Sequence, residues 1–125
     1  KRRRNAEFLT QGLQGLRCLS PPAVAPGTSH AFNLYTIRLD LEAGGISREE
    51  IQRALTRRGI ETAVHYPFPL HRQPVFRGLG TDEEFPQSTR LSKTVLSLPV
   101  HPGLRQHDLT HIVRSIRQVI GSASR

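Results

Sequence analysis

The most informative stretch of this 125-residue chain is Gly59-Ile60-Glu61-Thr62-Ala63-Val64-His65-Tyr66-Pro67-Phe68-Pro69-Leu70-His71. Two prolines flank an aromatic residue here, and each proline fixes its own φ and restricts the residue before it. Tyr66 and Phe68 are therefore expected in extended geometry. The segment is predicted to be a stiff arm with His65, Tyr66 and His71 at its tip, and stiff loops holding such groups are typical of binding sites. A proline-rich turn whose aromatic rings plug the edge of a core is the alternative interpretation.

The sequence on either side of this arm predicts alternating helices and strands. Apolar residues recur every three or four positions in the predicted helices and every second position in the strand around Tyr35. Ser47 and Glu50 have the spacing of a capping box, which marks a helix start. The corresponding fold class is α+β, with a small antiparallel-type sheet and helices packed on one face. The expected order is a helix over Arg2–Leu16, a loop over Ser20–Ser29, a strand over Phe32–Leu41, a turn at Ala43–Gly45, a helix from Ser47 to Gly59, a strand over Glu61–Tyr66, a helix that starts near Pro86, a strand over Leu96–Val100 and a last helix that ends at Gly121.

Length and composition fit one modest domain. The sequence contains no Met and opens on four basic residues, Lys1 to Arg4, so we expect it to be a piece of a longer chain. No apolar run approaches the length of a membrane span, and no contact with a membrane is expected. Cys18 is the single cysteine. It is expected to be an inert thiol, which suits a cytoplasmic location without requiring it.

The formal net charge of +8 raises the possibility of nucleic-acid binding. The charges are spread in a way that argues against it. Lys1 to Arg4 are terminal, and Arg57 and Arg58 lie at a helix end, where cations favour the helix dipole. The few aromatic residues do not alternate with arginines as a stacking surface requires. A basic α+β module for RNA or DNA remains the alternative function, while a basic surface also suits an anionic nucleotide-sugar.

One short segment, His107-Asp108-Leu109-Thr110-His111, imitates the spacing of a zinc protease helix. Its two histidines share a helix face, but a zinc site of this kind needs a third ligand, and Asp108 is one carbon shorter than the glutamate required. An acidic residue in the first turn of a helix has a simpler role opposite the dipole. The segment is therefore interpreted as a helix start, and no metal site is predicted.

Four blocks of the sequence share the order and spacing of one known family. They are Arg2-Arg3-Arg4-Asn5-Ala6, Leu34-Tyr35-Thr36-Ile37-Arg38, the arm from Gly59 to Gln73 and Leu96-Ser97-Leu98-Pro99-Val100-His101-Pro102. Together they resemble the DegT/DnrJ/EryC1/StrS family of sugar aminotransferases, which are pyridoxal-phosphate (PLP) enzymes of the aspartate-aminotransferase fold, fold type I. The likeness spans nearly the whole chain. Asn33 departs from it, because the family often has His at that position.

The resemblance implies a division of the parent enzyme between two domains. Residues 1–19 would form a helix leading from a large domain that this sequence lacks, and residues 20–125 would form the C-terminal small domain. In the family the Schiff-base lysine, the aspartate that pairs with the pyridinium nitrogen and the phosphate ligands lie in the large domain. Lys1 and Lys93 are the two lysines present here, and neither has such surroundings in the sequence. We therefore assign no catalytic or cofactor-binding residue, and expect this chain to be inactive and free of PLP when alone.

The resemblance also implies a reaction for the parent enzyme. It would transfer an amino group, from glutamate, to a keto-sugar linked to a nucleotide, in the biosynthesis of polysaccharide or antibiotic sugars. His65 and Tyr66 would lie over the cofactor pocket near the sugar, with His71 close behind. Imidazole and phenol suit substrate binding because both form hydrogen bonds with hydroxyls and diphosphate oxygens. The implied partners are the large domain, a second copy in a homodimer and the nucleotide-sugar.

A third possibility is a non-catalytic chain that forms homo-oligomers. Without its large domain, a small domain would expose the apolar surface that is normally covered, and exposed apolar patches associate.

Overall fold

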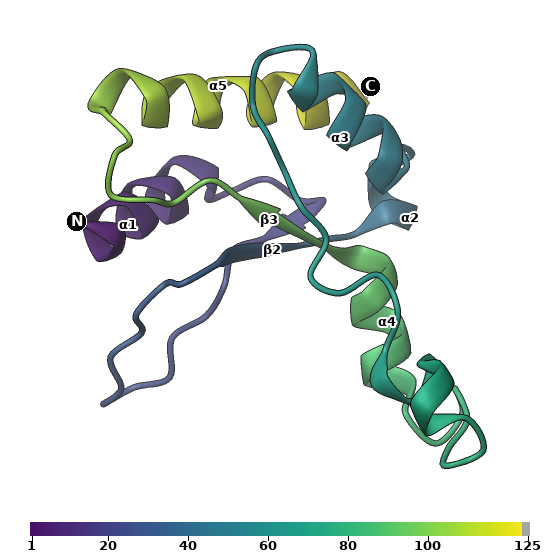
Figure 1. The fold of residues 1–125 in the computed structure, drawn as a ribbon. Helices are drawn as coiled ribbons and strands as arrows, with labels where there is room; N and C mark the ends of the chain where they lie inside the picture. Colours follow the sequence, from purple (N-terminus) through teal and green to yellow (C-terminus); the bar gives the residue numbers. More distant parts are fainter. Residues whose placement is uncertain (124–125) are drawn as a thin grey trace.

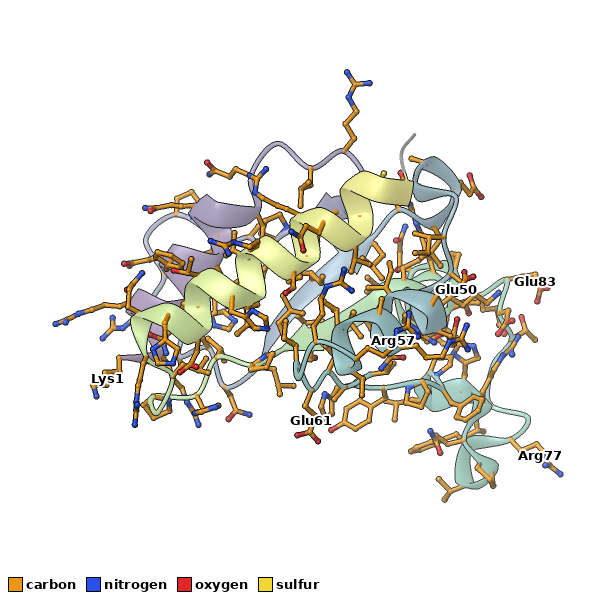
Figure 2. All side chains as sticks on the ribbon, turned by 90° about the horizontal axis from the view of Figure 1, so that it is seen from above. Lys1, Glu50, Arg57, Glu61, Arg77 and Glu83 are labelled. Carbon is orange, nitrogen blue, oxygen red and sulfur yellow. The ribbon has the colours of Figure 1, made fainter. Side chains whose placement is uncertain are left out.

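The computed structural model describes residues 1–123, which form a small antiparallel sheet with helices on one face (Figure 1). Strands β1, β2 and β3 lie in that order, and both neighbouring pairs are antiparallel. Seen from above, α5 crosses over the sheet between α1 and α3, whereas α4 leads away from it (Figures 1 and 2). The predicted fold class is confirmed. The elements are α1 (Arg2–Leu13), β1 (Leu19–Ser20), β2 (Tyr35–Leu39), α2 (Leu41–Gly44), α3 (Arg48–Thr56), the 3-10 turns η1 (Leu70–Arg72) and η2 (Pro74–Phe76), α4 (Pro86–Thr94), β3 (Val95–Leu98) and α5 (Gln106–Ala123).

Strand β2 is the centre of the fold because its alternating sequence gives it one apolar face. Tyr35, Ile37 and Leu39 are at most 3% exposed, whereas Arg38 on the opposite face is exposed. The hydroxyl of Tyr35 lies 2.8 Å from that of Thr10 on α1, so the buried phenol has a polar partner. The helices over this face contribute the remaining core, which includes Leu9, Leu13, Ile51, Leu55, Ile112, Ile116 and Ile120.

Helix α1 packs against α5 and ends earlier than predicted. It stops at Leu13 rather than Leu16, because Gly15 adopts a left-handed conformation with φ of 81°. Arg117 of α5 then donates from Nε to the main-chain carbonyl of Gly12 at 2.6 Å. A carbonyl at the end of a helix lacks an intrahelical partner, so this arginine stabilises the end of α1 while joining it to α5.

Helix α3 begins and ends as its sequence predicts. The Ser47 side chain accepts from the Glu50 amide, and the Glu50 carboxylate accepts from the Ser47 amide, which completes the capping box. At the other end Gly59 has φ of 75°, and the Ile60 amide donates to the Leu55 carbonyl at 3.0 Å. This is a Schellman arrangement, and it turns the chain into the arm.

The arm itself does not form the predicted strand over Glu61–Tyr66. It makes one isolated bridge to β3, in which Ala63 and Ser97 exchange two main-chain hydrogen bonds of 2.7 and 3.1 Å. Pro67 lacks the amide hydrogen that a longer ladder would need. After the bridge the chain therefore leaves the sheet and runs toward α4 (Figure 1).

The boundaries around β2 also differ from the prediction. The strand is shorter than Phe32–Leu41, since Asp40 begins a helical turn instead of extending it. Its carboxylate accepts from the Ala43 amide at 3.1 Å and caps α2, in place of the predicted turn at Ala43–Gly45. Gly45, with φ of 58°, then ends that helix.

Three further boundaries correct the sequence analysis. Strand β1 lies partly in the predicted loop and is too short to show an alternating pattern. β3 begins and ends earlier than Leu96–Val100. Helix α5 continues through Gly121, whose φ is not positive, so this glycine does not end it. The helix beginning at Pro86 agrees with expectation, and Cys18 is buried. Within the described residues, no helix has both the length and the apolar character needed to cross a bilayer.

The close approach of α1 and α5 predicts a destabilising glycine substitution. A Cβ atom at Gly12 would lie 2.7 and 2.8 Å from the two γ-methyl groups of Val113, whose χ1 is stiff in a helix. We expect Gly12→Ala to lower the free energy of unfolding by about 1–3 kcal/mol. Chemical denaturation measures this change.

Gly121→Ala is the matched control, because a Cβ atom there meets nothing within 4 Å. It should raise the free energy of unfolding by roughly 0.5–1 kcal/mol through helix propensity alone. Equal effects of the two substitutions would contradict the packing described for α1 and α5.

Candidate functional site

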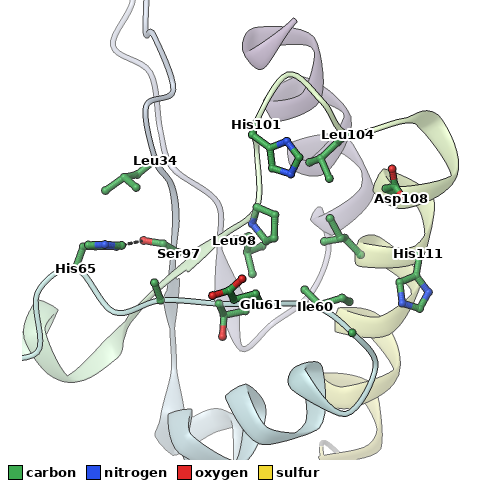
Figure 3. A pocket seen from close by; sticks show the side chains of 15 residues that line it. Leu34, Ile60, Glu61, His65, Ser97, Leu98, His101, Leu104, Asp108 and His111 are labelled. Atoms are coloured by element: carbon green, nitrogen blue, oxygen red, sulfur yellow. Dashed lines mark hydrogen bonds between the residues drawn. The ribbon is translucent and has the colours of Figure 1, made fainter.

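The arm brings His65 to the edge of the sheet. Its Nδ1 atom lies 3.4 Å from the hydroxyl of Ser97 (Figure 3). That hydroxyl lies 2.9 Å from the hydroxyl of Thr36. Ser97 is buried, whereas the imidazole of His65 is exposed. The Ser97 hydroxyl, which Thr36 on the adjacent strand holds in place, therefore contacts an otherwise accessible ring.

Tyr66 is exposed, as His65 is. Its side chain is 74% exposed and makes an edge contact with His65, with ring centroids 5.7 Å apart. The peptide bond between these two residues is cis. The phenol therefore stands beside the imidazole at the surface of the arm.

His71 lies in a different environment from His65. Its side chain is 7% exposed, and Nε2 lies 2.9 Å from Oδ1 of Asp82. The ring stacks on Phe85, with centroids 5.2 Å apart and an interplanar angle of 24°. The Thr89 hydroxyl lies 3.4 Å from the same Nε2 atom. His71 thus joins the arm to the loop and helix that follow it.

Asp82 is the centre of this junction, because it receives hydrogen bonds from two adjacent residues of η1. Arg72 donates from Nε to Oδ1 at 2.8 Å, and a second N–H of Arg72 donates to Oδ2. His71 donates to the same carboxylate. The hydrogen bonds from Arg72, followed by the one from His71, hold the pKa of Asp82 well below its usual range. We call Asp82, Arg72 and His71 the carboxylate clip.

The three predicted residues, His65, Tyr66 and His71, line one cavity of about 930 Å³. Most of the remaining wall is apolar, and Gln73 and Ser88 add polar groups. A largely apolar cavity with a few polar groups is the usual form of a ligand site. The apolar wall comes from the arm, the loop that the clip holds, α4 and the start of β3, and it includes Phe68, Leu70, Phe76, Leu79, Phe85, Leu91 and Val95.

His65 also lines a second cavity, of about 470 Å³ (Figure 3). His101 and His111 also line it. Asn5 of α1 donates to the carbonyl of His101 at 2.9 Å, and Nε2 of His111 lies 2.8 Å from the carbonyl of Arg58. These two hydrogen bonds to main-chain carbonyls stabilise the fold beside this cavity.

The predicted helix start at Asp108 is confirmed. Its carboxylate accepts from the amide of Arg105 at 2.8 Å, which is the role of an acidic residue in a first turn. Among residues 1–123, no three His, Cys, Asp or Glu side chains are grouped closely enough to hold a metal ion.

Neither lysine of the chain lines either of these cavities. Lys1 and Lys93 are both exposed, the second near the end of α4. A Schiff base with PLP requires an amine held in the cofactor site. The residues that surround these cavities do not supply one, so they do not fit the aldehyde of this cofactor.

The clip was not predicted from the sequence. Asp82 lies in Thr81-Asp82-Glu83-Glu84, a short acidic run that resembles any solvated loop. The signal that could have identified it is the distance of ten residues to Arg72, which a loop closing on itself can span. Ser97 and Thr36 were also missed, since both lie within segments predicted to be strands.

Comparison with known proteins relates this chain to one family of aminotransferases. A model of the DegT/DnrJ/EryC1/StrS aminotransferase family matches residues 1–117. The chain is 37% identical over 122 residues to a pleiotropic regulatory protein of Geobacillus stearothermophilus. It is 33% identical over 114 residues to dTDP-3-amino-3,4,6-trideoxy-alpha-D-glucose transaminase of Streptomyces venezuelae. These alignments cover 94% and 90% of this chain but 31% and 28% of the two relatives.

Solved structures agree with the sequence relationship. The crystal structure of S. venezuelae DesV in complex with a ketimine intermediate has a TM-score of 0.86 and 30% identity, over 99% of this chain and 31% of DesV. An aminotransferase, TlmJ of Streptoalloteichus hindustanus, has a TM-score of 0.85 at 26% identity. The chain therefore corresponds to just under a third of these enzymes.

The lowered pKa of Asp82 predicts how the clip responds to acid. A carboxylate whose pKa is lower in the folded state contributes stability above its unfolded pKa, and this contribution is lost as the pH falls through the folded pKa. Amide protection in residues 73–85 should therefore be complete above the unfolded Asp pKa of about 3.9 and decrease progressively as the pH falls below it. Hydrogen exchange, corrected for intrinsic rates, measures this protection.

Asp82→Asn removes the charge, so these amides should be less protected already at neutral pH. Asp40→Asn, which changes the cap of α2, is the control and should leave residues 73–85 as they are. Wild-type protection that does not change as the pH falls below about 4 would show that the folded clip does not stabilise the carboxylate.

Proposed function

The chain belongs to the DegT/DnrJ/EryC1/StrS aminotransferase family, and from that membership we propose that it is the C-terminal small domain of a PLP-dependent sugar aminotransferase. The parent enzyme would transfer an amino group, from glutamate, to a keto-sugar linked to a nucleotide. The observation that carries this proposal is the family match over residues 1–117, supported by the convergence of His65, Tyr66 and His71 on one cavity. The transaminase of S. venezuelae, named for a dTDP-linked amino sugar, supports the substrate class.

In this proposal the three residues bind substrate rather than carry out the chemistry. His65 and Tyr66 are exposed at the mouth of the cavity, where they can form hydrogen bonds with hydroxyl or diphosphate oxygens. His71 lies deeper and is held by the clip. The apolar wall contributes contact area and excludes water from these polar groups.

The lysine and the phosphate ligands that the reaction needs are proposed to lie elsewhere in the parent enzyme. When bound there, PLP would supply the electron sink that allows an amino group to be exchanged. Residues 1–19 would lead from that large domain and residues 20–125 would form the small domain, although Leu9 and Leu13 of α1 share one core with α5. The chain alone would be inactive.

The proposed assembly includes a homodimer in the cytoplasm. Large apolar side chains are exposed along the arm and the clipped loop, including Leu70 at 71%, Val75 at 80% and Leu79 at 74%. Such a patch on a small domain is typical of a surface that another polypeptide covers. The same patch favours self-association of the isolated chain. This is the alternative function, a non-catalytic chain that forms homo-oligomers.

The binding role of His65 is tested by substitution in the full-length parent enzyme. We expect His65→Ala to lower kcat/KM for the nucleotide keto-sugar by about 10- to 100-fold, the usual effect of removing one hydrogen bond to a charged group. Steady-state kinetics of amino transfer from glutamate measure the change. His107→Ala is the control, because this exposed histidine lines neither cavity. Activity of His65→Ala equal to that of the wild type would contradict the proposed site.

The absence of an aldimine lysine is tested on the isolated chain. PLP followed by borohydride should label no single lysine stoichiometrically, since Lys1 and Lys93 are both exposed and line neither cavity. Mass spectrometry after proteolysis locates any label. Stoichiometric modification of Lys93 alone would place the active site in this chain and overturn its assignment as a substrate-binding domain.

A further inference from the structure

The carboxylate clip has a chemical consequence for His71 that goes beyond holding a loop. An ionised carboxylate has only acceptor atoms, so the Nε2 atom of His71, 2.9 Å from Oδ1 of Asp82, must carry the hydrogen of this bond. In a neutral imidazole the other nitrogen, Nδ1, then carries the lone pair. Asp82 therefore determines which nitrogen of His71 can accept a hydrogen bond.

The charge of Asp82 is itself secured by its neighbour. Arg72 binds both carboxylate oxygens through Nε and a second N–H, the paired geometry in which guanidinium groups bind carboxylates most strongly. Since arginine stays protonated, the carboxylate keeps its acceptor character. Arg72 thus keeps Asp82 ionised, and Asp82 in turn holds neutral His71 in one tautomer.

Because the two nitrogens of an imidazole ring point in divergent directions, Nδ1 of His71 is directed away from Asp82 while Nε2 binds it. His71 and its stacking partner Phe85 both line the apolar cavity, whereas Asp82 does not. The Nε2 edge therefore turns from the cavity toward Asp82. Stacking on Phe85 and the Thr89 hydroxyl restrict rotation of the ring, so it cannot readily exchange its two edges.

We propose that Asp82, paired with Arg72, is a positioning residue that fixes neutral His71 with hydrogen on Nε2, so that Nδ1 accepts a hydrogen bond from a hydroxyl or amine of a ligand in the apolar cavity. Only the identity of that ligand rests on the proposed function. A site that offers an acceptor selects against ligands that lack a donor there, because a buried acceptor would be left unpaired.

His65 provides the internal contrast. Its Nδ1 atom faces the hydroxyl of Ser97, at 3.4 Å, and a hydroxyl can donate or accept. Nothing in that contact fixes the hydrogen on one nitrogen. Of the two cavity histidines, His71 is therefore the one whose hydrogen-bonding character the fold determines.

Nitrogen-15 NMR of the isolated chain tests the first part of this proposal. Long-range proton–nitrogen spectra at mildly alkaline pH should show His71 with hydrogen on Nε2, and that proton should exchange slowly with water. Asp82→Ala should abolish the slow exchange, and Asp82→Asn, which restores an acceptor oxygen, should recover it in part. The signals of the other histidines, His107 included, report whether each variant is folded. A His71 with hydrogen on Nδ1, or a slowly exchanging Nε2 proton that survives Asp82→Ala, would overturn the proposal.

A pair of small probes tests the second part. Phenol carries a hydroxyl donor on an apolar ring, and anisole has the same ring without the donor. Millimolar phenol should shift the Nδ1 resonance of His71, and anisole should not. An unchanged His71 signal with phenol, or equal shifts with both probes, would overturn the assignment of Nδ1 as an acceptor. These measurements need neither PLP nor a nucleotide-sugar, so the proposed function can fail while the role of Asp82 stands, and the reverse also holds.

Discussion

The isolated bridge between Ala63 and Ser97 is the contact on which the arrangement of the site depends. Two main-chain hydrogen bonds fix the arm against β3, and the side chain of the same serine approaches His65. Ser97 therefore fixes both the path of the arm and the position of His65. Because β3 is paired with β2 along its whole length, this anchor belongs to the most buried part of the fold.

The carboxylate clip fixes the other end of the arm. The chain between these two anchors contains Pro67 and Pro69, which restrict it further. Residues that lie far apart in the sequence, from the arm to α4, are thereby held around one apolar cavity. The two histidines lie in different environments. His65 is exposed and contacts the hydroxyl of Ser97, whereas His71 is enclosed and contacts the carboxylate of Asp82.

Sequence reasoning succeeded where a local pattern has one physical meaning. The capping box at Ser47, the left-handed Gly59 and the alternation along β2 are local, and the structure contains them. Sequence-based prediction failed where the structure of a segment depends on a partner that is distant in the sequence. The arm has the composition of a strand, but β3 offers it only one bridge. The two-residue strand β1 likewise forms because β2 is beside it. The site residues His65, Tyr66 and His71 were predicted from the proline-flanked arm and from family resemblance. Asp82 could be identified only once the closed loop was seen in the structure.

The central claim is that this chain is the small domain of a larger sugar aminotransferase, and the coding sequence upstream of Lys1 tests it most directly. Family membership is shown over residues 1–117, and the chain covers 31% and 28% of two of its relatives. Sequencing the transcript through this region should reveal an open reading frame that continues upstream into a large α/β domain with a lysine suited to bind PLP. A reading frame that starts at or just before Lys1, or an upstream domain without such a lysine, would contradict the account.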